Sequence, residues 1–169
     1  MATNVEIKAR VRDWQQVRTV AERLSQTPGE LLLQEDTFFH TRQGRLKLRV
    51  FAPDCGQLIY YERPDAPGPK RSDYLVAPTG EPEALKAVLA ASLGVRGVVR
   101  KSRWLYLAGH TRIHLDEVEG LGRFLELEVM LQPGQSEEEG AATARDLLAR
   151  LGIADQDLLQ GAYMDLLER

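Results

Sequence analysis

The chain has 169 residues, of which 43% are apolar and 28% are charged, and its formal net charge is -3. These values fit a single globular domain over residues 1–169 and give no net positive charge that would attract nucleic acid or an anionic membrane. The only cysteine, Cys55, excludes an intrachain disulfide. We find no signal-peptide pattern and no run of about 20 apolar residues, so we expect a cytoplasmic protein.

The first half of the chain predicts five strands and one helix. A strand over 3–12 alternates polar and apolar residues. An amphipathic helix over 13–26 follows, with Asp13 as its N-cap. Further strands are expected over the ranges 31–41, 45–51, 57–63 and 70–77, separated by turns rich in glycine and proline.

The second half predicts three more strands and two longer helices. The helices are expected over 81–94, with Pro82 in its first turn, and over 136–152, with Ser136 as its N-cap. A last short helix or pair of helices is expected within 155–169. The strands are expected over the ranges 95–107, 110–118 and 122–131. Eight strands joined mostly by hairpin turns predict an α+β fold with one antiparallel sheet and helices on its outside.

Several of these strands carry almost only charged residues on one face. The groups that share a face are Glu6 and Lys8; Lys47 and Arg49; Lys101 and Arg103; Arg112, His114 and Asp116; Glu126 and Glu128. Such a face can simply point to water, which is common for antiparallel sheets. Here, however, charges of one sign are neighbours, and they repel unless a counter-charge lies between them. The pattern therefore also fits a face turned towards an enclosed space that holds ions.

If the sheet closes with its apolar face under the helices, the charged residues line an eight-stranded antiparallel β-barrel. Such a barrel can hold one small ligand. An ionic interior favours a compact polyanion, such as triphosphate or a nucleoside triphosphate, bound by lysine and arginine. Carboxylates would hold a divalent cation, Mg²⁺ or Mn²⁺.

With these motifs in order, the sequence resembles the CYTH family, the triphosphate tunnel metalloenzymes. That family includes class IV adenylyl cyclases, thiamine triphosphatases and inorganic triphosphatases. Residues 4–8 match its E-x-E-x-K motif except at Asn4, and the segment "TRIHLDEVEGLGRFLELE" matches its later acidic pattern. The resemblance covers nearly the whole chain and implies an eight-stranded antiparallel tunnel, flanked by helices, that binds a triphosphate group with a divalent metal.

The resemblance also implies roles for individual residues. The metal site would be formed by Glu6, Asp116, Glu126 and Glu128. The substrate would be bound by Lys8, Lys47, Arg49, Lys70, Lys101, Arg103, Arg112 and Tyr163, of which Lys8, Arg49 and Arg112 would be catalytic. The segment "GAYMDLL" would place Tyr163 near the tunnel mouth. Lys70 is equally consistent with a solvated strand end, and His114 with a supporting role.

Three functions remain open from the sequence. We favour a metal-dependent triphosphatase acting on inorganic or small organic triphosphate. The first alternative is a class IV-type adenylyl cyclase that makes cyclic AMP and pyrophosphate from ATP. The second is a non-catalytic sensor of polyphosphate or nucleotide, because the amide of Asn4 cannot act as a base and would weaken a second metal site. Either a monomer or a homodimer fits the sequence.

Overall fold

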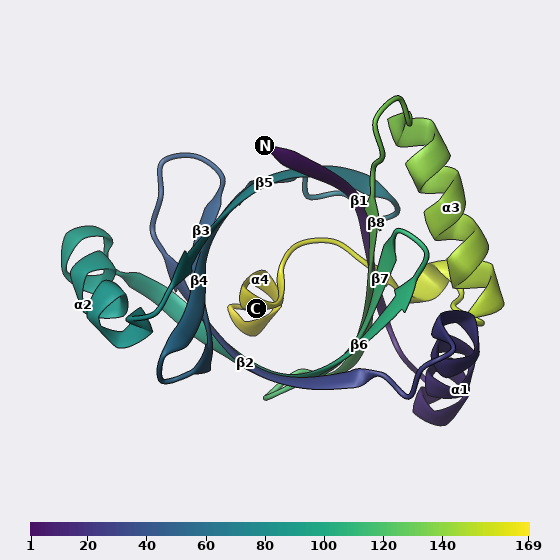
Figure 1. Ribbon diagram of the computed structural model, residues 1–169, viewed down its shortest axis with the longest axis horizontal. Helices are drawn as coiled ribbons and strands as arrows, with labels where there is room; N and C mark the ends of the chain where they lie inside the picture. Colours follow the sequence, from purple (N-terminus) through teal and green to yellow (C-terminus); the bar gives the residue numbers. More distant parts are fainter.

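The computed structural model describes residues 1–169 and shows one antiparallel sheet that closes into a barrel (Figure 1). Its strands are β1 (Ala2–Arg10), β2 (Glu30–Phe39), β3 (Arg45–Ala52), β4 (Cys55–Glu62), β5 (Lys70–Thr79), β6 (Val95–Ala108), β7 (Thr111–Val118) and β8 (Gly122–Met130). Their order around the barrel is β5-β4-β3-β2-β6-β7-β8-β1, and β1 pairs with β5 to close it. The predicted eight-stranded antiparallel barrel is confirmed.

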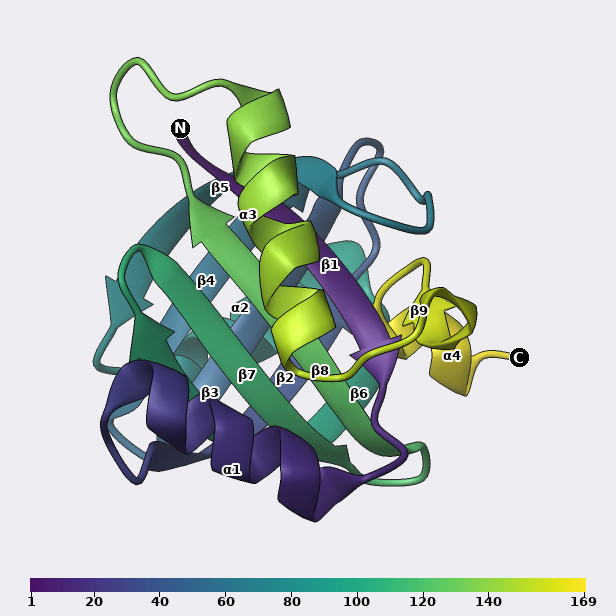
Figure 2. The same cartoon turned by 90° about the vertical axis from the view of Figure 1, so that its right-hand side faces the viewer.

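Three helices pack on the outside wall of the barrel, as expected (Figures 1 and 2). They are α1 (Trp14–Ser25), α2 (Pro82–Leu93) and α3 (Glu137–Arg150). The side chain of Asp13 accepts a hydrogen bond from the backbone N–H of Gln16 at the start of α1. Ser136 and Glu139 form a capping box at the start of α3. None of the helices has the length and apolarity needed to cross a membrane.

The main hydrophobic core lies between the barrel wall and the helices α1 and α3. Alternate residues of β1, β7 and β8 point outward into it, among them Ile7, Leu115 and Leu127, each at most 1% exposed. Because side chains alternate along a strand, the residues between these point into the barrel. The packing of the apolar face therefore determines that the charged face turns inward.

The C-terminal segment covers one end of the barrel. A short 3₁₀ helix, η1 (Asp155–Asp157), leads to strand β9 (Leu158–Leu159), which pairs with β1, and then to helix α4 (Tyr163–Leu167). In Figure 2, α4 lies across the end of the barrel where β1 finishes. Tyr163 and Met164 are buried there in a second apolar cluster. The fourth helix thus closes an end of the barrel, and the opposite end stays open.

Candidate functional site

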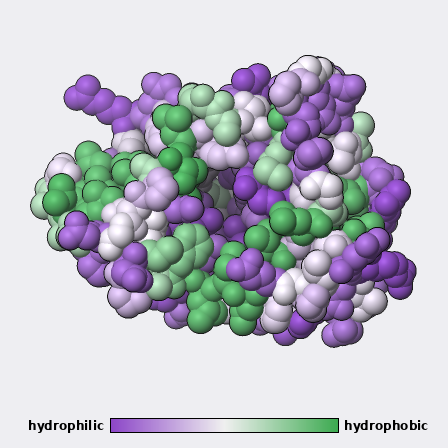
Figure 3. Space-filling model, in the orientation of Figure 1, coloured by the Kyte–Doolittle hydropathy of each residue, from purple (hydrophilic) through white to green (hydrophobic).

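The barrel encloses a cavity of about 300 Å³. Eleven of its lining side chains are acidic or basic: Glu6, Lys8, Asp36, Lys47, Arg49, Arg63, Lys101, Arg103, Arg112, Glu126 and Glu128. Seen from the open end, the surface is hollowed at its centre, with hydrophilic residues inside the hollow and hydrophobic residues along part of its rim (Figure 3). Seven lysines and arginines face four carboxylates, so basic side chains outnumber acidic ones on the wall.

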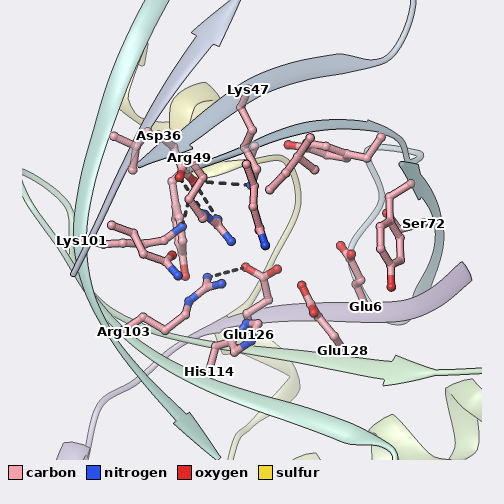
Figure 4. A pocket seen from close by; sticks show the side chains of 18 of the residues that line it. Glu6, Asp36, Lys47, Arg49, Ser72, Lys101, Arg103, His114, Glu126 and Glu128 are labelled. Atoms are coloured by element: carbon pink, nitrogen blue, oxygen red, sulfur yellow. Dashed lines mark hydrogen bonds and ion pairs between the residues drawn. The ribbon is translucent and has the colours of Figure 1, made fainter. Parts of the chain in front are cut away.

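One side of the cavity carries carboxylates from β1 and β8 (Figure 4). Glu6 lies directly opposite Glu128 in the sheet, and Glu126 lies opposite both Lys8 on β1 and His114 on β7. One ligand atom from each of His114, Glu126 and Glu128 lies within 4.8 Å of the other two. Carboxylate oxygens at this spacing suit a hard divalent cation, so the residues present fit the metal that the fold family implies.

Each of these carboxylates has a basic partner. Glu6 accepts a hydrogen bond of 2.8 Å from Arg63, and Glu128 one of 2.7 Å from Arg112. Glu126 lies 3.8 Å from the Lys8 ammonium. Burial alone would raise the pKa of Glu126, but the charges of Lys8 and Arg103 hold that pKa well below its usual value. Glu126 is therefore ionised at neutral pH.

The opposite side of the cavity is built around one buried acid, Asp36, which is 1% exposed. Arg49 donates two hydrogen bonds of 2.8 Å to Asp36, and the ammonium groups of Lys101 and Lys47 lie 3.3 and 3.5 Å from the same carboxylate. Burial lowers the pKa of Lys101 well below its usual value, and the neighbouring Arg103 lowers it further. Three buried basic groups thus share one carboxylate, so a bound anion would stabilise their protonated forms.

Of the remaining predicted basic residues, Lys8, Arg103 and Arg112 face the cavity. Lys8 is 3% exposed; its ammonium group lies 3.9 Å from the centre of the Tyr163 ring and donates to the Gly161 carbonyl. Burial lowers the pKa of Lys8 to about 8, although Glu126 opposes this shift. Since Tyr163 belongs to α4, it lies at the covered end of the tunnel, where its ring forms part of the cavity lining.

Two predicted site residues, Asp116 and Lys70, are not brought to the cavity with the others. Asp116 is fully buried behind Arg103, which donates two hydrogen bonds of 2.7 Å to it, and the Tyr163 hydroxyl donates a third. The charge of Arg103 outweighs burial and lowers the pKa of Asp116 to about 2. The ammonium group of Lys70 donates to the carbonyl of Ala66, in the loop before β5.

Sequence reasoning missed two charged residues of the cavity, Asp36 and Arg63. Asp36 alternates with Gln34 and Phe38 on β2, so its face lacked the run of charges seen on other strands. Arg63 follows directly after β4 and pairs with Glu6. Side chains two residues apart on a strand point the same way, so Arg63 could have been predicted to point inward with Tyr61.

Towards the open end, apolar and uncharged side chains join the wall of the cavity. Leu32, Phe51, Val76 and Leu105 line it near the ends of their strands. Asn4 and Ser72 lie opposite each other on β1 and β5. Both are buried, and the Asn4 Oδ1 and Ser72 Oγ atoms have no hydrogen-bond partner. Apolar and uncharged side chains therefore join the Arg112–Glu128 ion pair in the part of the cavity near its opening.

A closed antiparallel barrel whose interior combines carboxylates with lysines and arginines is a triphosphate tunnel. The family model of the CYTH domain matches residues 2–163, and this chain belongs to the CYTH domain family.

Individual relatives agree with this fold. The structure of the Pyrococcus horikoshii protein PH1012 has a TM-score of 0.82 and 26% sequence identity, over 96% of this chain and 98% of that chain. A Methanocaldococcus jannaschii protein named "Putative adenylate cyclase MJ0240" is 24% identical over 96% of this chain and 97% of its own length. A Vibrio parahaemolyticus structure with a similar name has a TM-score of 0.76 and 20% identity, over 99% of both chains.

Proposed function

We propose that this protein is a divalent-metal-dependent enzyme that hydrolyses inorganic or small organic triphosphate. The observation that carries the proposal is the enclosed cavity with seven lysines and arginines and four carboxylates. A triphosphate group remains negatively charged when one divalent cation is bound to it. The larger number of basic side chains on the wall suits this complex in sign, and the carboxylates suit its cation.

The carboxylates Glu6, Glu126 and Glu128 would hold the metal, Mg²⁺ or Mn²⁺. When bound, the metal would supply positive charge to the phosphate oxygens. The chain's own basic residues would bind the remaining oxygens: Lys8, Lys47, Arg49, Lys101, Arg103 and Arg112. Catalysis would rest on positioning and on neutralising developing charge, with Lys8, Arg49 and Arg112 closest to the reacting group.

Two residues would act through their neighbours. The contacts of Asp116 support a role in orienting Arg103, because both of its oxygens are occupied by Arg103 and one also accepts from Tyr163. The Tyr163 ring beside the Lys8 ammonium supports a role in placing that charge. Lys70 would contribute long-range positive charge at most, because its ammonium group is bound to the Ala66 carbonyl.

A second candidate function is adenylyl cyclase activity, which converts ATP to cyclic AMP and pyrophosphate. The names of the Methanocaldococcus jannaschii and Vibrio parahaemolyticus relatives favour it. The apolar side chains near the open end would also accept an organic group attached to the triphosphate. The two candidates differ in their products, since only the hydrolase releases orthophosphate without a cyclic nucleotide.

We further propose that residues 1–169 act as one domain in the cytoplasm, on a small-molecule triphosphate and without a nucleic acid or membrane partner. The single, exposed cysteine suits a reducing compartment. The net charge of -3 gives no general attraction to polyanionic polymers or membranes. Sedimentation analysis would distinguish a monomer from a homodimer.

The test is to incubate the protein with tripolyphosphate, thiamine triphosphate or ATP, with Mg²⁺ or Mn²⁺, and to resolve the products by phosphorus NMR. Orthophosphate release supports the triphosphatase, and cyclic AMP with pyrophosphate supports the cyclase. Arg103→Gln should abolish either activity. The matched control is Arg100→Gln, because Arg100 lies on the same strand, is exposed and pairs with Glu35 outside the barrel. Binding without turnover would contradict the proposal and favour a sensor.

A further inference from the structure

We infer that His114 supplies a nitrogen ligand to the metal, so that the site binds first-row transition-metal ions, from Mn²⁺ upward, more tightly than Mg²⁺. The inference rests on the proposed metal site at Glu126 and Glu128. It adds a residue whose role the sequence left open, and it predicts which class of divalent ion the protein selects.

The first argument is position. His114 is on β7 directly opposite Glu126 on β8, and its side chain points into the cavity beneath that carboxylate (Figure 4). Its ring nitrogen and one oxygen each of Glu126 and Glu128 lie within 4.8 Å of one another. Small rotations of these side chains would bring all three atoms to the bond lengths of a transition-metal ion, about 2.0–2.2 Å.

The second argument is an unmet hydrogen bond. His114 is 4% exposed, and its Nδ1 atom has no hydrogen-bond partner. A buried polar atom without a partner costs roughly 1–3 kcal/mol, and most such atoms in folded proteins are satisfied. A histidine that served only to fill the wall would be expected to have a partner for this nitrogen. A metal ion bound at Nδ1, between the imidazole and the two carboxylates, would provide one.

The third argument is the chemistry of the ligands. Mg²⁺ binds oxygen atoms almost exclusively and keeps much of its water shell. Imidazole suits ions such as Fe²⁺, Ni²⁺ and Zn²⁺, and affinity for mixed nitrogen and oxygen sites rises along the first row from Mn²⁺, the member of the row most similar to Mg²⁺. A site with one imidazole and two carboxylates therefore discriminates against Mg²⁺, whereas a site with carboxylates alone would discriminate much less.

The direct test is pulsed electron paramagnetic resonance of Mn²⁺ bound to the protein with tripolyphosphate, a ligand that contains no nitrogen. We expect a coupling from a directly bound ¹⁴N nucleus. In protein grown with ¹⁵N-labelled histidine, this coupling should become that of ¹⁵N. The labelling needs no substitution, so the result does not depend on the folding of a variant.

Calorimetry provides the quantitative test. His114→Gln should weaken Mn²⁺ binding about tenfold or more and change Mg²⁺ binding much less, because only the imidazole ligand is lost. The matched control is His110→Gln, since His110 is exposed in the turn before β7. The control should retain both affinities and the nitrogen coupling.

The outcomes separate this inference from the proposed function. Bound Mn²⁺ without a nitrogen coupling, or equal losses of Mn²⁺ and Mg²⁺ affinity in His114→Gln, overturns the role of His114 and leaves the carboxylate site intact. A protein that binds neither Mn²⁺ nor Mg²⁺ in the presence of tripolyphosphate contradicts the proposed function itself.

Discussion

Replacing Asp36 by Asn should destabilise the protein strongly in the absence of a polyanion. Asp36 is 1% exposed and is the shared counter-charge of Arg49, Lys101 and Lys47. The amide keeps the shape of the side chain but removes its charge. Three cations then lie together inside the barrel without a carboxylate between them.

The expected loss follows from the burial of this cluster. Removing one partner of a buried ion pair costs about 3–5 kcal/mol, because the other charge stays desolvated. In a domain of this size, each kcal/mol lowers the melting temperature by about 2–4 °C. We therefore expect Asp36→Asn to melt roughly 6–20 °C below the unsubstituted protein. The matched control is Glu35→Gln, because the half-buried Glu35 pairs with Lys86 and Arg100 on the outer face. It should cost about 1 kcal/mol or less.

Two further measurements on Asp36→Asn test the same reasoning. Tripolyphosphate should raise its melting temperature more than it raises that of the unsubstituted protein, since the anion replaces the lost counter-charge. The deficit should also shrink as the pH rises. Burial lowers the pKa of Lys101 well below 10.5 in the folded protein, and the charge of Asp36 opposes this shift. Without Asp36 the folded-state pKa falls further, so over a wider pH range below 10.5 the unfolded variant binds more protons than the folded one, and the variant gains more stability with rising pH than the unsubstituted protein. Equal stability of Asp36→Asn and Glu35→Gln would refute the idea of a positively charged wall.

Three other outcomes are expected. Lys8→Ala and Arg49→Ala should each keep the circular dichroism spectrum but abolish tripolyphosphate binding in calorimetry; unchanged affinity in both would rule out the tunnel as the binding site. Leu127→Asp should unfold the protein, because Leu127 is fully buried between the barrel and the helices; a folded, soluble variant would contradict the assignment of the two sheet faces. Tripolyphosphate binding at pH 8 should take up protons, since the pKa of Lys8 is about 8 in the free protein and a bound anion raises it; calorimetry in buffers of different ionisation enthalpy measures this, and a heat independent of the buffer would contradict it.

The barrel and its inner face were predictable because strand periodicity is a local signal. Leu127 alternates with Glu126 and Glu128, so once one face is buried the other must point inward. The closure of the barrel came from the family resemblance and is confirmed by the pairing of β1 with β5.

The partners within the cavity could not be predicted in the same way. Asp116 shares a face with Arg112, and the family resemblance implied that it is a metal ligand. Its binding to Arg103 depends on the register between β6 and β7, which sequence spacing does not reveal. The position of α4 likewise depends on distant contacts, because Asp165 accepts hydrogen bonds from Arg45 and Arg96. A five-residue helix carries too little local signal to indicate where it docks.

The helix α4 also has a consequence for polymeric substrates. Because α4 lies over one end of the barrel, where Tyr163 lines the cavity, we expect ligands to enter from the other end, where the surface is hollowed (Figures 2 and 3). A long polyphosphate could not thread through and could insert only its terminus. If the proposed chemistry holds, the protein would shorten such chains from their ends and never cut them internally. The fragment formed at the covered end of the cavity could leave only after the outer fragment had left, so product release would be ordered. An outer product that stayed bound would block release of the inner fragment and would therefore be an effective inhibitor.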